Sequence, residues 1–471
     1  MKQLIRNLLL VSVAFILVFV FLVLGIIFQQ ERSRTNLAGH GGENKLALAD
    51  QYAKAGRILD RQGIILASSE HGQRRYAEDP LLASALVQTI GDYSHNIANT
   101  IEERYQAELT GSNRGFFKQL VFDLKGQGLK GSDLRLSLDA DLCRKAAELL
   151  EPYRASMVVL NYQTGEILCL VNTPLVAPDQ VIHWQNIEEG SLFNKALLGQ
   201  YTPGSTFKLI TDAAWISSDQ FQPDYQVQCK GREPLLGPGS VLENRQDAGH
   251  GLLDRSQALA LSCNHYFGQL ALNVGAMQLF KTAENFAFNA PLSLDKLSVM
   301  PSQLKISPQL DDYTLSWLAI GQPIEGQKLT VSPLHLAMIS GAIAQGGQMM
   351  EPHLLAEVLN PGSSRGELTQ PRTAYIVGTR SSMELLAQDM IYAVQHGMAQ
   401  GAQVSGQVVG GKTGTAEHAG QVGDNQSNSL FTGFLQNPEC PLAISLVVEN
   451  QWVDVSAIAG QILAYALDKQ A

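Results

Sequence analysis

Residues 199–210 read Gly-Gln-Tyr-Thr-Pro-Gly-Ser-Thr-Phe-Lys-Leu-Ile, and this stretch decides how the rest of the chain is interpreted. Pro203 and Gly204 end the segment before them, and an apolar run compatible with a helix follows. The sequence therefore predicts Ser205 at or near a helix N-terminus, with Lys208 one turn further along the same face. A lysine that burial has partly neutralised can take the proton of a neighbouring hydroxyl and create a nucleophile. A capping serine beside a solvated lysine is the alternative, so the pair needs partners elsewhere in the chain.

The composition is that of a globular protein. The chain has 471 residues, enough for two or three domains, and 45% of them are hydrophobic while 17% are charged. The formal net charge is -10, and no long run of Lys or Arg occurs. Nucleic-acid binding therefore has little support.

One segment near the N-terminus is long and apolar enough to cross a membrane. Residues 8–28 are 21 consecutive positions without a charge, and the polar residues after them contain no small-x-small cleavage pattern. We therefore expect an uncleaved, single-pass anchor. Lys2 and Arg6 favour a cytoplasmic N-terminus, although Arg32 and Arg34 dilute the bias. The rest of the chain is then expected on the extracytoplasmic side of the cell membrane.

The cysteines do not form the closely spaced pairs that are typical of metal sites; they are Cys143, Cys169, Cys229, Cys263 and Cys440. An oxidising compartment would permit bridges, but their odd number leaves at least one thiol within a monomer. We expect them to behave as small buried hydrophobic residues, and the sequence predicts no metal site.

The order of predicted elements indicates an α+β fold. After a polar tether at 29–50, the elements of a small module are expected as short strands within 56–67, helices within 80–109 and a Gly- and Lys-rich linker at 111–131. The predictions that follow are a strand at 134–138, a helix at 139–150, a hairpin at 157–171, helices at 252–261, 266–272 and 333–344, strands at 408–411, 430–435 and 442–448, and a helix at 456–467. Strands at both ends predict one antiparallel sheet flanked by helices, with a helical insertion beside it.

Two further motifs supply the partners that Ser205 and Lys208 need. Ser262-Cys263-Asn264 lies between two helical segments, and Lys412-Thr413-Gly414 lies on a predicted strand. A Ser-x-x-Lys, a Ser-x-Asn type and a Lys-Thr-Gly motif in this order are the elements of serine β-lactamases and penicillin-binding proteins. The three together are far more specific than any one alone.

The sequence resembles the class B penicillin-binding proteins, the membrane-anchored D,D-transpeptidases that cross-link peptidoglycan. The similarity extends to the segments 201–208, 320–322, 331–337, 412–417 and 56–61, and it is strongest from 135 to 468. Leu430 stands where the family often has Trp, and the N-terminal part is short, as in the small penicillin-binding protein A type. The resemblance implies an anchor at 8–28, a dimerisation or pedestal-like module at 45–132, and a penicillin-binding transpeptidase domain at 135–468.

The resemblance also implies roles for individual residues. Ser205 is expected to be the acylated nucleophile and Lys208 its base, while Lys412 lowers the pKa of Lys208 by like-charge repulsion. Ser262 and Asn264 are expected to relay the proton and hold the peptide amide. The substrate-binding residues are expected to be Lys412, Thr413, Gly414 and Thr415, and the backbone N–H groups of Ser205 and Thr415 are expected to form the oxyanion hole. No metal ion or organic cofactor is implied.

The implied partners are stem peptides that end in D-Ala-D-Ala, β-lactam antibiotics, the cytoplasmic membrane, and a SEDS-type glycosyltransferase or another divisome or elongasome protein. Two kinds of alternative stay open: a β-lactamase or membrane β-lactam sensor of the same fold, and a non-catalytic scaffold of cell-wall synthesis. Among other polar residues, His250 is expected to make a structural hydrogen bond and His265 to cap or pack. Glu417 and His418 are expected to begin a solvated loop.

Overall fold

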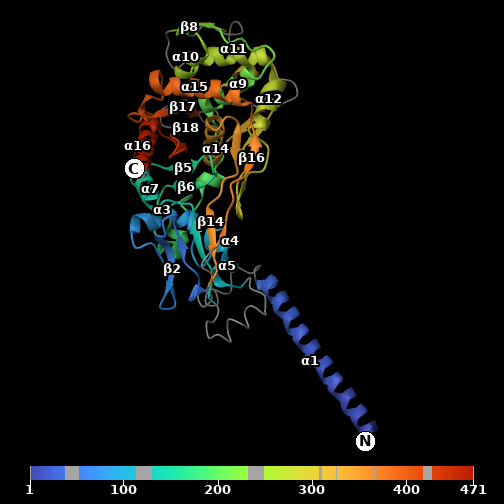
Figure 1. Cartoon of the computed structure of the whole chain (residues 1–471). Coiled ribbons are helices and arrows are strands. Elements are labelled where there is room, and N and C mark those ends of the chain that lie inside the picture. The colour runs from blue at the N-terminus through green and yellow to red at the C-terminus, as the bar shows by residue number, and fades with distance from the viewer. Residues whose placement is uncertain are drawn as a thin grey trace.

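The computed structural model describes residues 2–37, 52–112, 130–231, 249–306, 310–324, 326–361, 363, 366–416 and 427–469. Most of the predicted tether and linker and the loop that begins at Glu417 lie outside these ranges. Residues 29–37, which were predicted as tether, continue the first helix, α1 (Lys2–Leu37). Within α1, the segment Ile5–Val23 has a mean hydropathy of 2.6 and is not buried by other parts of the chain, so it is long and apolar enough to span a membrane (Figure 1).

The central layer is a five-stranded antiparallel sheet in the order β17-β18-β19-β5-β6. Its strands are β5 (Ala155–Asn161), β6 (Ile167–Asn172), β17 (Val408–Ala416), β18 (Asn428–Gln436) and β19 (Leu442–Val448). Every residue of β6 and β19 is buried, because helices cover both faces of the sheet. The predicted sheet of early and late strands is therefore confirmed.

Helices pack on both faces of this sheet (Figure 1). The helix α14 (Pro333–Ala344) covers one face, and α7 (Ala140–Leu150) and α16 (Val455–Asp468) contact each other and the sheet on the other side. Hydroxyl groups fix α14 to the strands: Ser445 Oγ donates to the Pro333 carbonyl at 2.6 Å, and Thr432 Oγ1 donates to the Leu336 carbonyl at 2.7 Å. These bonds satisfy polar groups that would otherwise be costly to bury.

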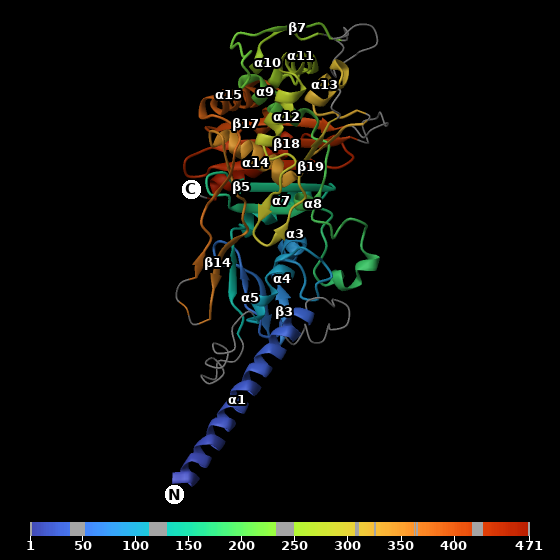
Figure 2. The ribbon, with the colours of Figure 1, turned by 90° about the vertical axis from the view of Figure 1, so that its right-hand side faces the viewer.

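A helical insertion lies beyond the β17 edge of the sheet (Figure 2). Its elements are α9 (Lys208–Ile216), β7 (Val227–Cys229), β8 (Gly251–Leu253), α10 (Arg255–Ala260), α11 (Asn264–Val274), α12 (Ala276–Asn285) and α13 (Asp312–Ala319). The predicted helix at 252–261 is wrong at its start, because residues 251–253 pair as β8. Asp254 then begins α10 through a capping box with Gln257. The helix α15 (Arg380–His396) contacts both β17 and α10.

Short elements complete this part of the chain. They are η1 (Gln180–Asn186), α8 (Lys195–Leu198), η2 (Gly204–Phe207), β9 (Ser293–Leu294), β10 (Leu297–Ser298), β11 (Gln303–Lys305), β12 (Lys328–Thr330), β13 (Gln348–Met350), β16 (Thr373–Ile376) and η3 (Gln400–Ala402). The pairs β9/β10, β11/β12 and β13/β16 are two-stranded antiparallel ribbons beside the main sheet.

A second sheet, near α1, combines three separate parts of the chain. Its order is β15-β14-β4-β1-β2-β3, and β1 and β4 pair in parallel. The strands are β1 (Ile58–Leu59), β2 (Ile65–Glu70), β3 (Gln73–Tyr76), β4 (Asp133–Leu136), β14 (Leu355–Leu359) and β15 (Glu367–Leu368), and the helices beside them are α3 (Pro80–Ile90), α4 (Ile101–Arg104) and α5 (Gln106–Thr110). The sheet therefore crosses the boundary that the sequence placed between residues 132 and 135.

A buried ion pair joins β3 to α4. Arg74 Nε lies 2.8 Å from Glu102 Oε1, and both side chains are fully shielded from solvent. Arg74 Nη1 also donates to the Gly56 carbonyl at 2.7 Å, directly before β1. The guanidinium thus connects three segments of the N-terminal sheet and its helices.

We expect Arg74→Ala to lower the free energy of unfolding by about 3–5 kcal/mol, because it leaves the Glu102 carboxylate buried without its cation. The matched control is Arg144→Ala, which removes exposed ion pairs to Asp79 and Glu148 and costs about 1 kcal/mol or less. Urea unfolding followed by circular dichroism measures both. Equal losses in the two variants would contradict the assigned role of the buried pair.

Candidate active site

Ser205 lies in a tight turn that is pressed against the edge of the central sheet. The 3₁₀ turn η2 contains Ser205, and α9 begins only at Lys208, so the serine precedes the helix and makes no capping hydrogen bond. Gly204 has a φ of +52°, and a Cβ atom there would lie 2.3 Å from the Thr415 carbonyl oxygen. Glycine is therefore required for both the turn and its contact with β17.

The Lys208 amine is fully buried and meets four oxygen atoms. Its Nζ lies 2.6 Å from both the Ser262 carbonyl oxygen and Asn264 Oδ1, and 3.1 Å from the hydroxyls of Ser205 and Ser262. Burial lowers the pKa of Lys208 well below its usual range, and the nearby Lys412 lowers it further. A neutral amine has two N–H groups and one lone pair. The carbonyl and amide oxygens take the two N–H groups, which leaves the lone pair to accept a proton from a hydroxyl.

Lys412, on the strand β17, also contacts the Ser262 hydroxyl. Its Nζ lies 3.0 Å from Ser262 Oγ and 2.7 Å from the Thr413 carbonyl oxygen, and burial lowers the pKa of Lys412 to about 7. The Ser262 hydroxyl therefore bridges the two lysines, with Lys208 3.1 Å away on its other side. Because Lys208 Nζ contacts the hydroxyls of both Ser205 and Ser262, these three groups form a continuous path for a proton.

The short loop between α10 and α11 supplies Ser262, and the start of α11 supplies Asn264. Ser262 has a φ of +54°, and Asn264 is the first residue of α11. Cys263, between them, is fully buried, and burial raises the pKa of its thiol to about 12. The thiol is therefore protonated near neutral pH in the absence of a bound metal, which argues against Cys263 as a second nucleophile.

The motif strand β17 is an edge strand of the five-stranded sheet. Lys412 and Gly414 are buried, whereas Thr413 and Thr415 are partly exposed. A Cβ atom at Gly414 would lie 2.9 Å from both the Pro203 carbonyl oxygen and Thr206 Cγ2, so glycine allows the serine turn to pack on the strand. The predicted catalytic residues thus form one hydrogen-bonded group, with the predicted substrate-binding residues beside it.

Gln322 makes a polar contact with the motif strand that the three motifs alone do not predict. Its Nε2 donates to the Thr415 carbonyl oxygen at 3.0 Å, and the neighbouring Gly321 carbonyl accepts from Gly204 N–H at 3.1 Å. This segment therefore holds both the serine turn and β17. The sequence signal was the Gly-Gln pair at 321–322, which the resemblance singled out without a role.

The comparison with known proteins agrees with this geometry. The family model "Penicillin binding protein transpeptidase domain" matches residues 155–467. The chain belongs to this family. Among known family members, the peptidoglycan D,D-transpeptidase PbpA of Mycolicibacterium smegmatis is 27% identical over 445 residues, which cover 89% of each chain. The family assignment and its penicillin-binding protein A type, both predicted from the sequence, are confirmed.

Solved structures of this family have the same fold. The crystal structure of PBPA from Mycobacterium tuberculosis is 25% identical, with a TM-score of 0.77 over 88% of this chain and 99% of that one. The penicillin G acyl-enzyme complex of penicillin-binding protein A from the same organism is 25% identical, with a TM-score of 0.76 and the same coverage. The predicted transpeptidase fold is therefore confirmed.

We expect Gly321→Ala to destabilise the protein more than Gly326→Ala. Both glycines have a φ near +80°, so each substitution carries the left-handed strain of about 1–2 kcal/mol. At Gly321 the new Cβ would meet backbone, 1.9 Å from the Gly204 carbonyl oxygen, whereas a Cβ at Gly326 would have no atom of the described residues within 4 Å. Urea unfolding of the two variants measures the difference. If Gly326→Ala proved equally destabilising, the close approach at Gly321 would be refuted.

Proposed function

We propose that this chain is a membrane-anchored peptidoglycan D,D-transpeptidase that acts through a serine acyl-enzyme and is acylated by β-lactams. The observation that carries the proposal is the buried Lys208 amine, 3.1 Å from the Ser205 hydroxyl, with its two other short contacts to oxygen acceptors. This is a base held next to a nucleophile. The names of the similar proteins, and the β-lactam acyl-enzyme complex among them, support the same reaction.

Acylation begins with proton transfer from Ser205 to the neutral amine of Lys208. Ser205 Oγ then attacks the carbonyl carbon between the two terminal D-Ala residues of a stem peptide, and a tetrahedral intermediate forms. Its collapse breaks the peptide bond, and the leaving D-Ala amine takes a proton from the Ser262 hydroxyl. Ser262 recovers that proton from Lys208, which is 3.1 Å away.

The developing oxyanion needs two donors fixed in advance. The backbone N–H groups of Ser205 and Thr415 are the proposed pair, each worth about 3 kcal/mol in the transition state. Support comes from the contact that Gly204 and Gly414 allow between the serine turn and β17. Gln322 is a positioning residue here, because its hydrogen bond to the Thr415 carbonyl fixes the orientation of that part of the strand.

The substrate is proposed to lie along β17. An extended donor peptide can pair with an edge strand, and the Lys412 ammonium with the hydroxyls of Thr413 and Thr415 then binds its terminal carboxylate. After D-Ala leaves, an amine from a neighbouring stem attacks the ester. Lys208 accepts the proton of that amine and returns it to Ser205, which releases the cross-linked product. A β-lactam acylates Ser205 by the same first step.

The anchor and the N-terminal module are proposed to place this chemistry outside the cell. Residues 8–28 would cross the cell membrane with the transpeptidase domain, residues 135–468, on the extracytoplasmic side; Lys2 and Arg6 before the span support this orientation. The segment 45–132 remains the core of the proposed N-terminal module, to which β4, β14 and β15 add strands. A SEDS-type glycosyltransferase or another divisome or elongasome protein is its proposed partner.

We expect Ser205→Ala to abolish covalent labelling of the full-length protein by a fluorescent penicillin, because it removes the hydroxyl that is proposed to be acylated. Ser381→Ala, at the exposed start of α15, is the matched control and should label normally. Gel fluorescence and intact-mass measurement of the adduct provide the readouts. Persistent labelling of Ser205→Ala would sink the assignment.

The time course of the wild-type adduct separates a transpeptidase from a β-lactamase and from a non-catalytic scaffold. A transpeptidase should give one burst of acylation followed by slow release, because its acyl-enzyme is resolved by an amine acceptor rather than by water. Steady hydrolysis of penicillin would instead support the β-lactamase alternative. Complete absence of labelling would support the alternative that the protein is a non-catalytic scaffold of cell-wall synthesis.

We expect the rate constant of acylation to follow a bell-shaped pH profile. On the acid side the rate falls as Lys208, whose pKa is lowered, gains a proton and can no longer act as a base. On the alkaline side, above about pH 7, the rate falls as Lys412 loses its proton and its positive charge. Lys412→Gln removes a positive charge that disfavours the protonation of Lys208, so the acid limb should move to higher pH and the alkaline limb should disappear. Stopped-flow labelling across the pH range measures both limbs. Lys469→Gln, at an exposed ion pair, is the control; an acid limb that stays in place in Lys412→Gln would contradict the coupling.

A further inference from the structure

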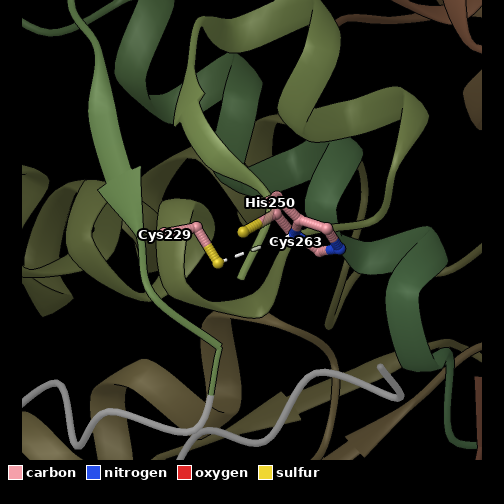
Figure 3. A group of neighbouring side chains, drawn as sticks. All are labelled: Cys229, His250 and Cys263. Carbon is pink, nitrogen blue, oxygen red and sulfur yellow. Dashed lines mark hydrogen bonds between the residues drawn. The ribbon is translucent and has the colours of Figure 1, made fainter. Parts of the chain in front are cut away.

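Three side chains, one of them from the Ser262–Asn264 segment itself, lie close enough to bind one metal ion (Figure 3). They are Cys229, His250 and Cys263, whose potential ligand atoms all lie within 4.8 Å of one another. Cys229 and Cys263 are buried, and His250 is half-buried. The sequence had assigned Cys263 to packing and His250 to a structural hydrogen bond, and the large separations along the chain hid their proximity.

The local fold brings the three residues together from separate segments. Cys229 ends β7 and pairs with Gly251 of β8, so His250, directly before β8, lies next to Cys229. A Cβ atom at Gly249 would lie 2.5 Å from the Cys229 carbonyl oxygen, which shows how closely the two segments approach. Cys263 comes from the loop before α11, so its sulfur lies at the positive end of an eleven-residue helix.

The distances fit zinc. Cys229 Sγ lies 3.6 Å from His250 Nδ1. Zinc bonds of about 2.3 Å to sulfur and about 2.0–2.1 Å to nitrogen, at a tetrahedral angle, separate two such ligands by about 3.6 Å. Two sulfur ligands would be about 3.8 Å apart by the same geometry. The two sulfur atoms lie no more than 4.8 Å apart, so a small side-chain adjustment is enough to bring them to that distance.

The chemistry of the three ligands also selects the ion. When the two thiols release their protons to solvent on metal binding, the resulting thiolates and an imidazole suit zinc, whereas magnesium and calcium prefer oxygen ligands. A zinc ion bound by two thiolates carries no net charge, so it can sit in this buried place near the two lysines without adding to their repulsion. Three protein ligands leave one tetrahedral position for water or another ligand.

We propose that Cys229, His250 and Cys263 form a zinc site that restrains the Ser262–Asn264 segment through Cys263. Cys263 lies between Ser262 and Asn264, both of which contact the Lys208 amine. An ion held by Cys263 therefore restrains the residues on either side of it, with Ser262 in its left-handed conformation. The zinc takes no part in the reaction. Metal binding is independent of the proposed function, whereas the effect of the metal on acylation rests on that function.

The first test measures binding directly. Full-length protein in detergent is stripped with a chelator under reducing conditions and then titrated with Zn²⁺ or Co²⁺. We expect one ion per chain and, for Co²⁺, the thiolate charge-transfer bands of a tetrahedral sulfur site. Cys229→Ser and His250→Ala should weaken binding by more than about 100-fold, beyond the loss that an outer-shell partner causes. Cys440→Ser, at another buried cysteine, should bind like the wild type. His250 is half-buried, so His250→Ala keeps the test valid if Cys229→Ser fails to fold.

The second test links the ion to the loop. Removing zinc should slow acylation of the wild type by fluorescent penicillin about tenfold or more, and adding zinc should restore it, while His250→Ala should be slow with or without zinc. Ser205→Ala should bind zinc normally and never label. Labelling without zinc binding would overturn the metal site and leave the transpeptidase standing; zinc binding with a labelled Ser205→Ala would do the reverse. A Cys229–Cys263 disulfide, found by mass spectrometry in protein that takes up no zinc after reduction, would also overturn the site.

Discussion

The burial of two lysine side chains around one serine hydroxyl is the constraint on which this structure depends. A lysine in water is protonated and cannot act as a base, so Lys208 must be buried before it can take a proton. Burial requires the helical insertion, the Ser262 loop and the edge strand β17 to close on one another, because each contributes part of the enclosure. The two amines differ in what they do there: Lys208 is driven towards neutrality, while Lys412 has a pKa of about 7 and keeps its charge on the acid side of neutrality.

Backbone contacts and a buried carboxylate network set the positions of these elements. Gly204, Gly321 and Gly414 let three segments approach within distances that a Cβ atom would forbid. Further along α9, Asp212 lies close to Arg255, whose Nε is also 2.6 Å from Asp389 Oδ2 on α15. Burial and the neighbouring Asp389 raise the pKa of Asp212 well above its usual range. This network ties α9, α10 and α15 together one turn beyond the reactive lysine, so the helix cannot shift without breaking it.

The sequence predicts the parts of the site that local chemistry determines. Ser205, Lys208, Ser262, Asn264 and Lys412 were found because each motif has its own residue pattern, and the periodicity placed the motifs at a helix N-terminus, in a loop and on a strand. The contacts between motifs were out of reach, since Gln322 and Thr415 are brought together only by tertiary folding. The grouping of Cys229 with His250 depends on the β7–β8 pairing, which a helical prediction at 252–261 had hidden. The prediction of the N-terminal sheet was also incomplete. The strand β14 follows α14 and β13 in the chain and joins this sheet only through tertiary folding.

That shared sheet decides how the N-terminal module is attached. A module joined by one linker is free to turn, whereas this one receives β4 before the central sheet and β14 after α14. Ser137 strengthens the junction, since its hydroxyl lies 2.8 Å from the Ile167 carbonyl at the start of β6 and 3.0 Å from the His353 carbonyl before β14. Residue 166 also bridges to His353. The chain therefore crosses between the two sheets at several points. One of these crossings follows α14 and β13, and α14 itself packs against the strand that carries Thr432. The N-terminal sheet is thus attached through β6 of the central sheet and through the segment that follows α14.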